Sequence, residues 1–223
     1  MGILFPYLAI ALTLLITVFH HSALKRRYGE AKGMWLYFLL FFLLLEAFPV
    51  MILAVVETDP LRGLAALGMG AGNYRIGLIL TLAALPVALL LGFFGSGVAE
   101  MRRWYPFSKQ ACTADGAFVA YELGYLLLYY TAWEFLYRGL LFFPLLSSTG
   151  FLPAAVITAV LSTMHHIGHP KTEIFSSLIA GIVFAAIALL TRSFLYCAAI
   201  HAMVGISTDT FIYLKNYRRA RGV

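Results

Sequence analysis

Residues 131–144 read Thr131-Ala-Trp-Glu-Phe-Leu-Tyr-Arg-Gly-Leu-Leu-Phe-Phe-Pro144, inside a long apolar run from about residue 116 to residue 146. The stretch holds two opposite charges, Glu134 and Arg138, four residues apart, so a helix places both side chains on one face. A charged side chain at the centre of a membrane helix costs roughly 2.5–3.5 kcal/mol on insertion scales. Two interpretations stay open at this point: a neutralised pair that locks helices together, or groups kept for a function.

The composition of the whole chain predicts an all-α, polytopic membrane protein in contact with membrane lipids. Of its 223 residues 62% are hydrophobic and 12% charged, and the mean hydropathy is +0.88. A soluble domain is nearer half apolar and a quarter charged. The formal net charge of +6 comes from basic residues in short loops and the tail. Basic residues in these positions orient the membrane spans and contact anionic lipid. The positive charge therefore does not indicate nucleic-acid binding. Cys112 and Cys197 are too few for a disulfide framework.

Apolar runs separated by polar turns predict about seven transmembrane helices. They cover approximately residues 3–23, 34–56, 74–98, 116–146, 152–166, 174–190 and 194–214. The first, third and fifth loops and the tail hold twelve basic residues, against three in the second and sixth loops. This bias predicts an N-terminus outside and a C-terminal tail in the cytoplasm.

Ionisable side chains fall within the last four predicted spans: Glu122, Glu134, Arg138, His165, His166 and His201, with His169 at an edge. Glu134 and His165 lie at nearly the same depth, because each is roughly thirteen or fourteen residues from the outer end of its span at about 1.5 Å per residue. His201 would lie higher unless its span is short or kinked. We therefore expect one acid and histidines from two other helices to converge, with a carboxylate taking a proton from water and imidazoles steadying an oxyanion.

Other uses of these side chains remain open. A single histidine in a membrane helix is more often a hydrogen-bonding partner between helices than a catalyst. Glu46 and Glu122 are interpreted as structural. The spacing His165-His166-x-x-His169 puts imidazoles on one face but lacks the acid of His-Glu-x-x-His. No metal and no cofactor is therefore expected.

Three short motifs resemble those of the CPBP family, the CAAX-protease and bacteriocin-processing intramembrane proteases. Glu134-Phe-Leu-Tyr-Arg138-Gly resembles Glu-Glu-x-x-x-Arg, and Leu161-Ser-Thr-Met-His165 or Ser162-Thr-Met-His-His166 resembles Phe-x-x-x-His. His201-Ala-Met-Val-Gly205 resembles His-x-x-x-Asn or Asp. The resemblance covers about residues 117 to 210. It implies N-terminal helices over residues 1–115, a CPBP-like catalytic core over 116–214 and a basic cytoplasmic tail over 215–223.

The resemblance implies an intramembrane endopeptidase in which Glu134 deprotonates a water molecule. His165 or His166, together with His201, would bind the oxyanion or protonate the leaving amine, and Arg138 would hold Glu134. The implied substrate is a peptide or protein with a lipidated, tagged or leader-bearing terminus. The small size of the chain and its lack of extra domains lead us to expect a bacterial or archaeal cytoplasmic membrane as its location.

Two departures from the family pattern keep alternatives open. Trp133 replaces the first Glu, which is usually taken as the base in this family, and Gly205 replaces the Asn. The alternative is therefore a catalytically inactive scaffold that binds a membrane partner. A small transporter or proton relay is a third possibility, although no pair of broken half-helices supports it.

Overall fold

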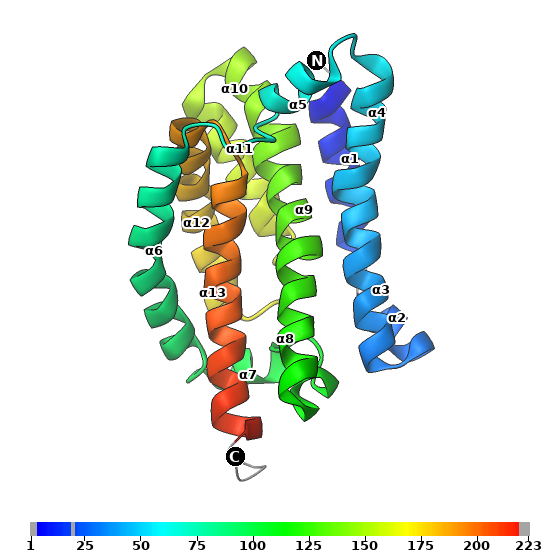
Figure 1. The fold of residues 1–223 in the computed structure, drawn as a ribbon, viewed down its shortest axis with the longest axis vertical. Helices are drawn as coiled ribbons and strands as arrows, with labels where there is room; N and C mark the ends of the chain where they lie inside the picture. Colours follow the sequence, from blue (N-terminus) through cyan, green and yellow to red (C-terminus); the bar gives the residue numbers. More distant parts are fainter. Residues whose placement is uncertain (1–3, 19–20, 219–223) are drawn as a thin grey trace.

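Every regular element among residues 4–18 and 21–218, the part that the computed structural model describes, is a helix. The long helices run roughly along one axis, and α1 begins at the end of the molecule opposite to the one at which α13 ends (Figure 1). The all-α membrane fold expected from the composition is confirmed. The α-helices are α1 Leu4–Val18, α2 His21–Tyr28, α3 Glu30–Phe42, α4 Phe48–Val56, α5 Pro60–Ala66, α6 Tyr74–Gly95, α7 Ala99–Trp104, α8 Asp115–Gly124, α9 Thr131–Glu134, α10 Phe143–Thr149, α11 Phe151–Met164, α12 Lys171–Thr191 and α13 Leu195–Tyr213. Four π-helical segments, η1 Leu43–Ala47, η3 Tyr125–Tyr130, η4 Phe135–Phe142 and η5 Leu214–Arg218, and the 3₁₀ turn η2 Gln110–Thr113 complete the set.

Fewer helices pass a length test for crossing a membrane than the seven that the sequence predicts. In the described residues four stretches are long and apolar enough: Glu30–Val56, Tyr74–Gly95, Lys171–Thr191 and Leu195–Tyr217. A fifth is added if α1 and α2 form one bent span. The described part of the predicted span 3–23 is divided between these two helices. His20 and the last basic residues of the tail, Arg219 and Arg221, lie outside the described residues.

The helix that carries Glu134 is the centre of the bundle. It runs without a break from α8 through η3, α9 and η4 into α10, and every residue of η4 is buried. Elements from both halves of the chain pack on it, namely α1, α3, η1, α11, α12 and α13. The η4 segment is apolar on nearly all sides, as expected of a helix enclosed by other helices. Any polar group in it therefore faces other protein groups.

A π-helical segment also interrupts the helix that contains Pro49. The segment η1 holds Glu46, and Pro49 follows in the first turn of α4. Proline removes a backbone hydrogen bond and crowds the preceding turn, and the wider π turn lies just where this happens. Because η1 packs against α9, the irregular part of this helix lies beside the segment that ends at Glu134.

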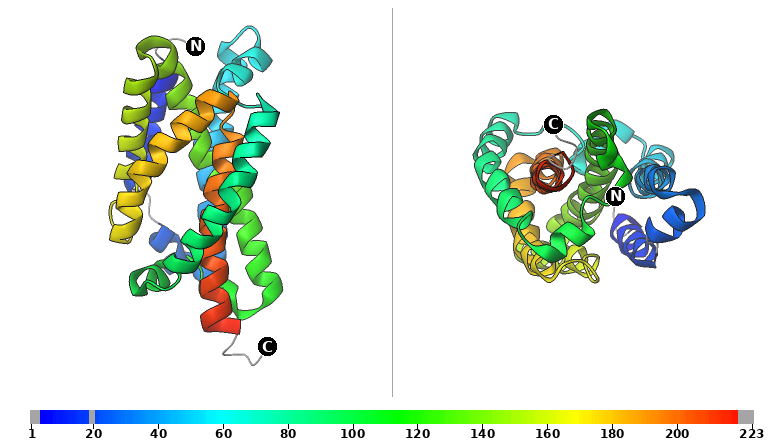
Figure 2. Two further views of the ribbon diagram at one scale, coloured as in Figure 1. Left: turned by 90° about the vertical axis from the view of Figure 1, so that its left-hand side faces the viewer. Right: turned by 90° about the horizontal axis from the view of Figure 1, so that it is seen from below.

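Helices α11 and α12 form a short antiparallel hairpin. Gly181 of α12 faces Ala159 of α11 so closely that a Cβ on Gly181 would meet the Ala159 Cβ at 2.7 Å. The turn between the helices stops short of the end of the molecule at which α13 ends (Figure 2). Helix α11 has 14 residues, fewer than the roughly 20 needed to cross a bilayer. The hairpin therefore turns within the depth of the bundle and places His165, His166 and Glu173 against other helices or loops.

Candidate active site

Glu134 is completely buried, with one carboxylate oxygen hydrogen-bonded and the other paired with a guanidinium group. It ends the single α-helical turn α9 between the π-helical segments η3 and η4. His201 Nδ1 donates to Glu134 Oε1 over 2.7 Å, and Arg138 Nε lies 3.2 Å from Oε2. The i,i+4 pair predicted from the sequence is therefore formed, with a histidine of another helix as a third member. π-Helical turns occur frequently at functional sites, and here they flank the acidic residue.

Arg138 is held within the protein interior by more than its acid. Its side chain is 2% exposed. Its Nη2 donates to the Gly181 carbonyl oxygen over 3.5 Å, and its Cζ lies 5.4 Å from the centre of the Phe184 ring. Buried charges persist only when they are paired and hydrogen-bonded. Arg138 thus anchors the Glu134 carboxylate to α12.

His201 is the accessible member of this group. Its side chain is 23% exposed, whereas that of Glu134 is 0% exposed. Because Nδ1 donates its hydrogen to the carboxylate, the other ring nitrogen, Nε2, carries the lone pair in the neutral imidazole. A carboxylate that fixes the imidazole in this way is the arrangement by which an acid orients a histidine base.

Gly205 lies one turn beyond His201 on α13, where the family pattern has Asn or Asp. A Cβ at Gly205 would overlap the Tyr130 hydroxyl, and the Tyr130 ring lies 4.7 Å from the His201 ring. Tyr130 belongs to η3, one turn before Glu134. The Tyr130 hydroxyl, from the central helix, therefore occupies the space that a side chain at residue 205 would fill.

Trp133 places an indole against all three predicted histidines. Its ring centre lies 4.6 Å from that of His165, 5.0 Å from that of His166 and 6.1 Å from that of His201. The side chain is 2% exposed. The position at which the family pattern has its first Glu thus supplies an aromatic wall between the imidazoles.

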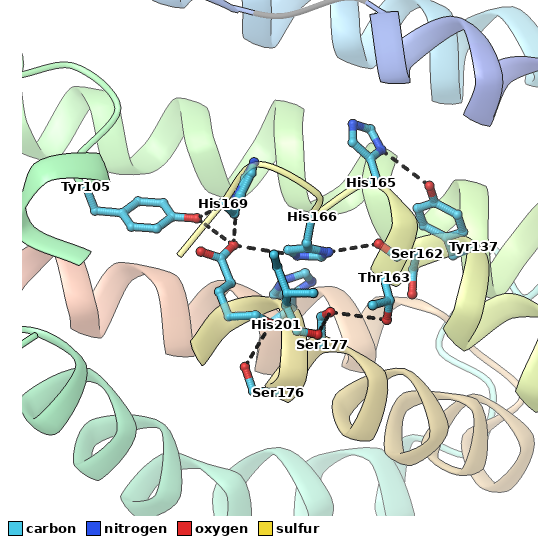
Figure 3. A network of polar contacts seen from close by, with 12 residues as sticks. Tyr105, Tyr137, Ser162, Thr163, His165, His166, His169, Ser176, Ser177 and His201 are labelled. Carbon is cyan, nitrogen blue, oxygen red and sulfur yellow. Dashed lines mark hydrogen bonds and ion pairs between the residues drawn. The ribbon is translucent and has the colours of Figure 1, made fainter. Parts of the chain in front are cut away.

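The neighbouring histidines His165 and His166 point in different directions (Figure 3). His165 Nδ1 lies 3.3 Å from the Tyr137 hydroxyl, and the residue lines a cavity of about 120 Å³ together with His21 and Tyr37. His166 Nδ1 lies 2.8 Å from the Ser162 carbonyl oxygen, and its Nε2 faces α12. The sequence left the choice between them open because the two residues end a helix, where helical periodicity no longer orders side chains.

A second acid, the partly buried Glu173, lies in the first turn of α12. Its Oε1 accepts hydrogen bonds from the Tyr105 hydroxyl at 2.7 Å and from His169 Nδ1 at 2.9 Å, and His166 Nε2 lies 3.7 Å away (Figure 3). Sequence reasoning set this acid aside because it lies past Pro170, between the predicted spans 152–166 and 174–190. The spacing His169-x-x-x-Glu173 was the available signal, since residues four apart share a helix face.

The segment between α7 and α8 covers this second acid. Trp104 at the end of α7 packs on His169 with ring centres 4.8 Å apart, and the next residue is Tyr105. Nothing in the sequence could have placed Tyr105 here, because it lies in an irregular loop. Within the part of the chain that the structure describes, no three His, Cys, Asp or Glu side chains are arranged to hold a metal ion.

The two remaining predicted groups lie apart from Glu134. Glu122 is buried on the same helix, and twelve residues at about 1.5 Å each put it roughly 18 Å from Glu134 along the axis. Both of its carboxylate oxygens lack a hydrogen-bond partner. Glu46 lies in η1. Neither belongs to the group formed by Glu134, Arg138 and His201.

These features define a helical, multi-pass membrane protein with a buried group of acid, guanidinium and imidazole side chains on three helices. Residues 116–207 match a family model described as type II CAAX prenyl endopeptidase Rce1-like. This segment is thus an Rce1-like domain of the CPBP family, as the three motifs indicated. The matched segment contains Glu134, Arg138, His165, His166, Glu173 and His201. Comparisons with curated proteins and with solved structures returned no match. The domain points to a protease of the CAAX type.

Proposed function

We propose that the protein is an intramembrane endopeptidase that cleaves a membrane-associated peptide or protein terminus with a water molecule activated by Glu134 and His201. The observation that carries this proposal is the hydrogen bond of 2.7 Å between His201 Nδ1 and Glu134 Oε1. His201 is partly exposed whereas Glu134 is fully buried, which supports different roles for the two residues. Glu134 holds the imidazole, and His201 Nε2 takes the proton from water.

This mechanism differs in one respect from the expectation drawn from the sequence, in which Glu134 itself took the proton. Both Glu134 oxygens already face cationic or donor groups, Arg138 and His201. The carboxylate is also fully buried, whereas the His201 ring is partly exposed. The imidazole lone pair is the better proton acceptor in this geometry. General-base assistance of this kind contributes about 10²–10⁴ in rate.

His166 is the proton donor to the leaving amine in this proposal, and Tyr130 supplies a neutral hydroxyl on the His201 side. His165 is assigned no step, since its ring pairs with Tyr137 and faces the cavity next to α1. The substrate is a peptide segment that lies at the membrane surface. A prenylated C-terminus is the first choice because the matched family is described by that activity.

The orientation belongs to the same proposal. Helices α2 and α7 and segment η5 lie at one end of the bundle and hold seven of the fourteen described Lys and Arg residues, and α5 lies at the other end (Figure 1). The positive-inside rule supports a cytoplasmic position for the basic end. A cell membrane is the proposed location, with the N-terminus outside.

The experiment uses the full chain in lipid nanodiscs with a farnesylated peptide ending in a C-a-a-X sequence, in water enriched in ¹⁸O. Mass spectrometry should find a truncated peptide carrying one ¹⁸O in its new carboxyl group. His201→Ala should lower the rate by about 10²–10⁴. Glu122→Gln is the matched control, a buried glutamate of the same helix that lies outside the site, and it should cleave at the wild-type rate. Absence of cleavage, or cleavage that is indifferent to His201→Ala, rejects the proposal.

The alternative of an inactive scaffold is favoured by one observation, the Trp133 indole against the histidines. It predicts that the chain binds a membrane partner without cleaving it. The ¹⁸O experiment separates the two, because a scaffold leaves the peptide unlabelled at every concentration of protein.

A further inference from the structure

Glu173 presents a carboxylate that the reaction described above does not yet use. The side chain is 18% exposed, and its second oxygen, Oε2, is buried without a hydrogen-bond partner. The first oxygen binds the Tyr105 hydroxyl and His169 Nδ1. Three separate elements, the α7–α8 loop, the α11–α12 turn and α12 itself, therefore hold one acid in place. An acid in the first turn of a helix is favoured by the helix dipole alone, but that role needs none of these partners.

The contacts of His166 decide which of its nitrogens carries a proton. Its Nδ1 lies 2.8 Å from the Ser162 carbonyl oxygen, which only accepts hydrogen bonds, so Nδ1 carries hydrogen. Its Nε2 lies 3.7 Å from Glu173 Oε1. In the neutral ring a lone pair on Nε2 would face the carboxylate, whereas a proton on Nε2 turns this contact into an attraction. Glu173 therefore favours the form of His166 that carries a proton on both nitrogens.

The groups around His166 are consistent with this arrangement. His169 packs edge-on with ring centres 5.5 Å apart, and it already donates its own Nδ1 hydrogen to Glu173. Trp133 packs on His166 at 5.0 Å and carries no charge. The only carboxylate in contact with His166 among the described residues is that of Glu173. The acid that serves this histidine is thus supplied by α12 and not by the helix of Glu134.

We propose that Glu173 is a positioning residue of the active site that stabilises the protonated form of His166 when it donates a proton to the leaving amine. This inference rests on the proposed function. The water oxygen bonds to the substrate carbonyl carbon, and its proton passes to His201 Nε2. The carbon–nitrogen bond then breaks with its electron pair on nitrogen, which takes the proton from His166 Nε2. Transfer of one proton from His201 to His166 through solvent restores the starting state, so one water is consumed for each bond cut.

The test compares two leaving groups in the full chain in nanodiscs. One substrate is the farnesylated C-a-a-X peptide. The other is a 4-nitrophenyl ester with the same farnesylated acyl segment, whose leaving group departs without a proton. Glu173→Gln should lower kcat on the peptide by about 10²–10⁴ with KM unchanged, and lower kcat on the ester by less than about threefold. Glu173→Asp should recover part of the peptide rate.

The outcomes separate this inference from the proposed function. His201→Ala removes the base and should lower cleavage of both substrates. Equal losses on peptide and ester in Glu173→Gln would show a structural or other role and overturn the inference, as would a wild-type peptide rate in that variant. Both of those results leave the endopeptidase itself in place. If the wild-type chain cleaves neither substrate, the proposed function fails first. Thermal midpoints of Glu173→Gln and of the control Glu122→Gln verify that each variant is folded.

Discussion

Glu134→Gln tests whether the buried charges act as a pair, and its effect on stability follows from the exposures. Glu134 and Arg138 are 0% and 2% exposed and lie 3.2 Å apart. Removing the negative charge leaves a buried guanidinium without its counterion. Breaking a buried ion pair from one side costs roughly 3–5 kcal/mol, whereas replacing both partners by neutral groups of similar volume is often neutral. We therefore expect Glu134→Gln to lose roughly 3–5 kcal/mol and Glu134→Gln/Arg138→Met to lose clearly less.

The measurement is reversible unfolding in mixed detergent micelles, followed by tryptophan fluorescence, alongside the endopeptidase assay. We expect stability and enzymatic activity to respond differently in the double variant. The double variant should regain stability but stay inactive, because neither a charged acid nor its anchor then orients His201. Strict additivity of the two single-variant losses would refute the pairing, since coupled residues give non-additive free energies. A wild-type rate in Glu134→Gln would refute the role of the carboxylate.

Three further changes have defined outcomes. Gly205→Ala should lower stability by about 1–3 kcal/mol, because its Cβ overlaps the Tyr130 hydroxyl; unfolding measurements on Gly205→Ala/Tyr130→Phe should show partial recovery, and equal losses in both would contradict the clash. Trp133→Ala should cost about 3–5 kcal/mol because a large aromatic side chain is removed from among the imidazoles, and a loss below about 1 kcal/mol in the same assay would speak against this packing. Burial raises the pKa of Cys112, which lies in the α7–α8 segment, to about 12, so in a Cys197→Ala background its alkylation at pH 8 should be about a thousandfold slower than in unfolded chain. Because the folded pKa is the higher one, the stability that this thiol contributes is full below its ordinary pKa and is lost as the pH rises towards 12; native labelling as fast as unfolded labelling would show that Cys112 is exposed.

The sequence predicted the features that follow from hydrophobicity and helical spacing. The helical membrane fold is confirmed, and the pairing of Glu134 with Arg138 follows directly from their separation by four residues. Motif order also located the Rce1-like domain. These inferences work because lipid tolerates so few charged side chains that each one present is informative.

The remaining parts of the site depend on tertiary structure that the sequence does not encode locally. The orientation of His165 and His166 is set by the turn that ends α11, where no periodicity applies. Glu173 lies between two predicted spans because Pro170 interrupts the helical pattern. Its contacts with His166 and His169 form only because α11 and α12 pack as a hairpin. The π-helical turns on either side of Glu134 have no recognised sequence signature.

The short α11–α12 hairpin also has a consequence for the surrounding lipid. At about 1.5 Å per residue, the 14 residues of α11 extend roughly 21 Å, against a hydrocarbon thickness of about 30 Å. Ile167 and Phe175 flank the turn and are 70% and 77% exposed. Acyl chains meeting this side of the protein must shorten or tilt to avoid leaving a gap, which draws the headgroup layer inward. A substrate terminus held near the headgroups would then lie at nearly the depth of the His166 and His201 imidazoles.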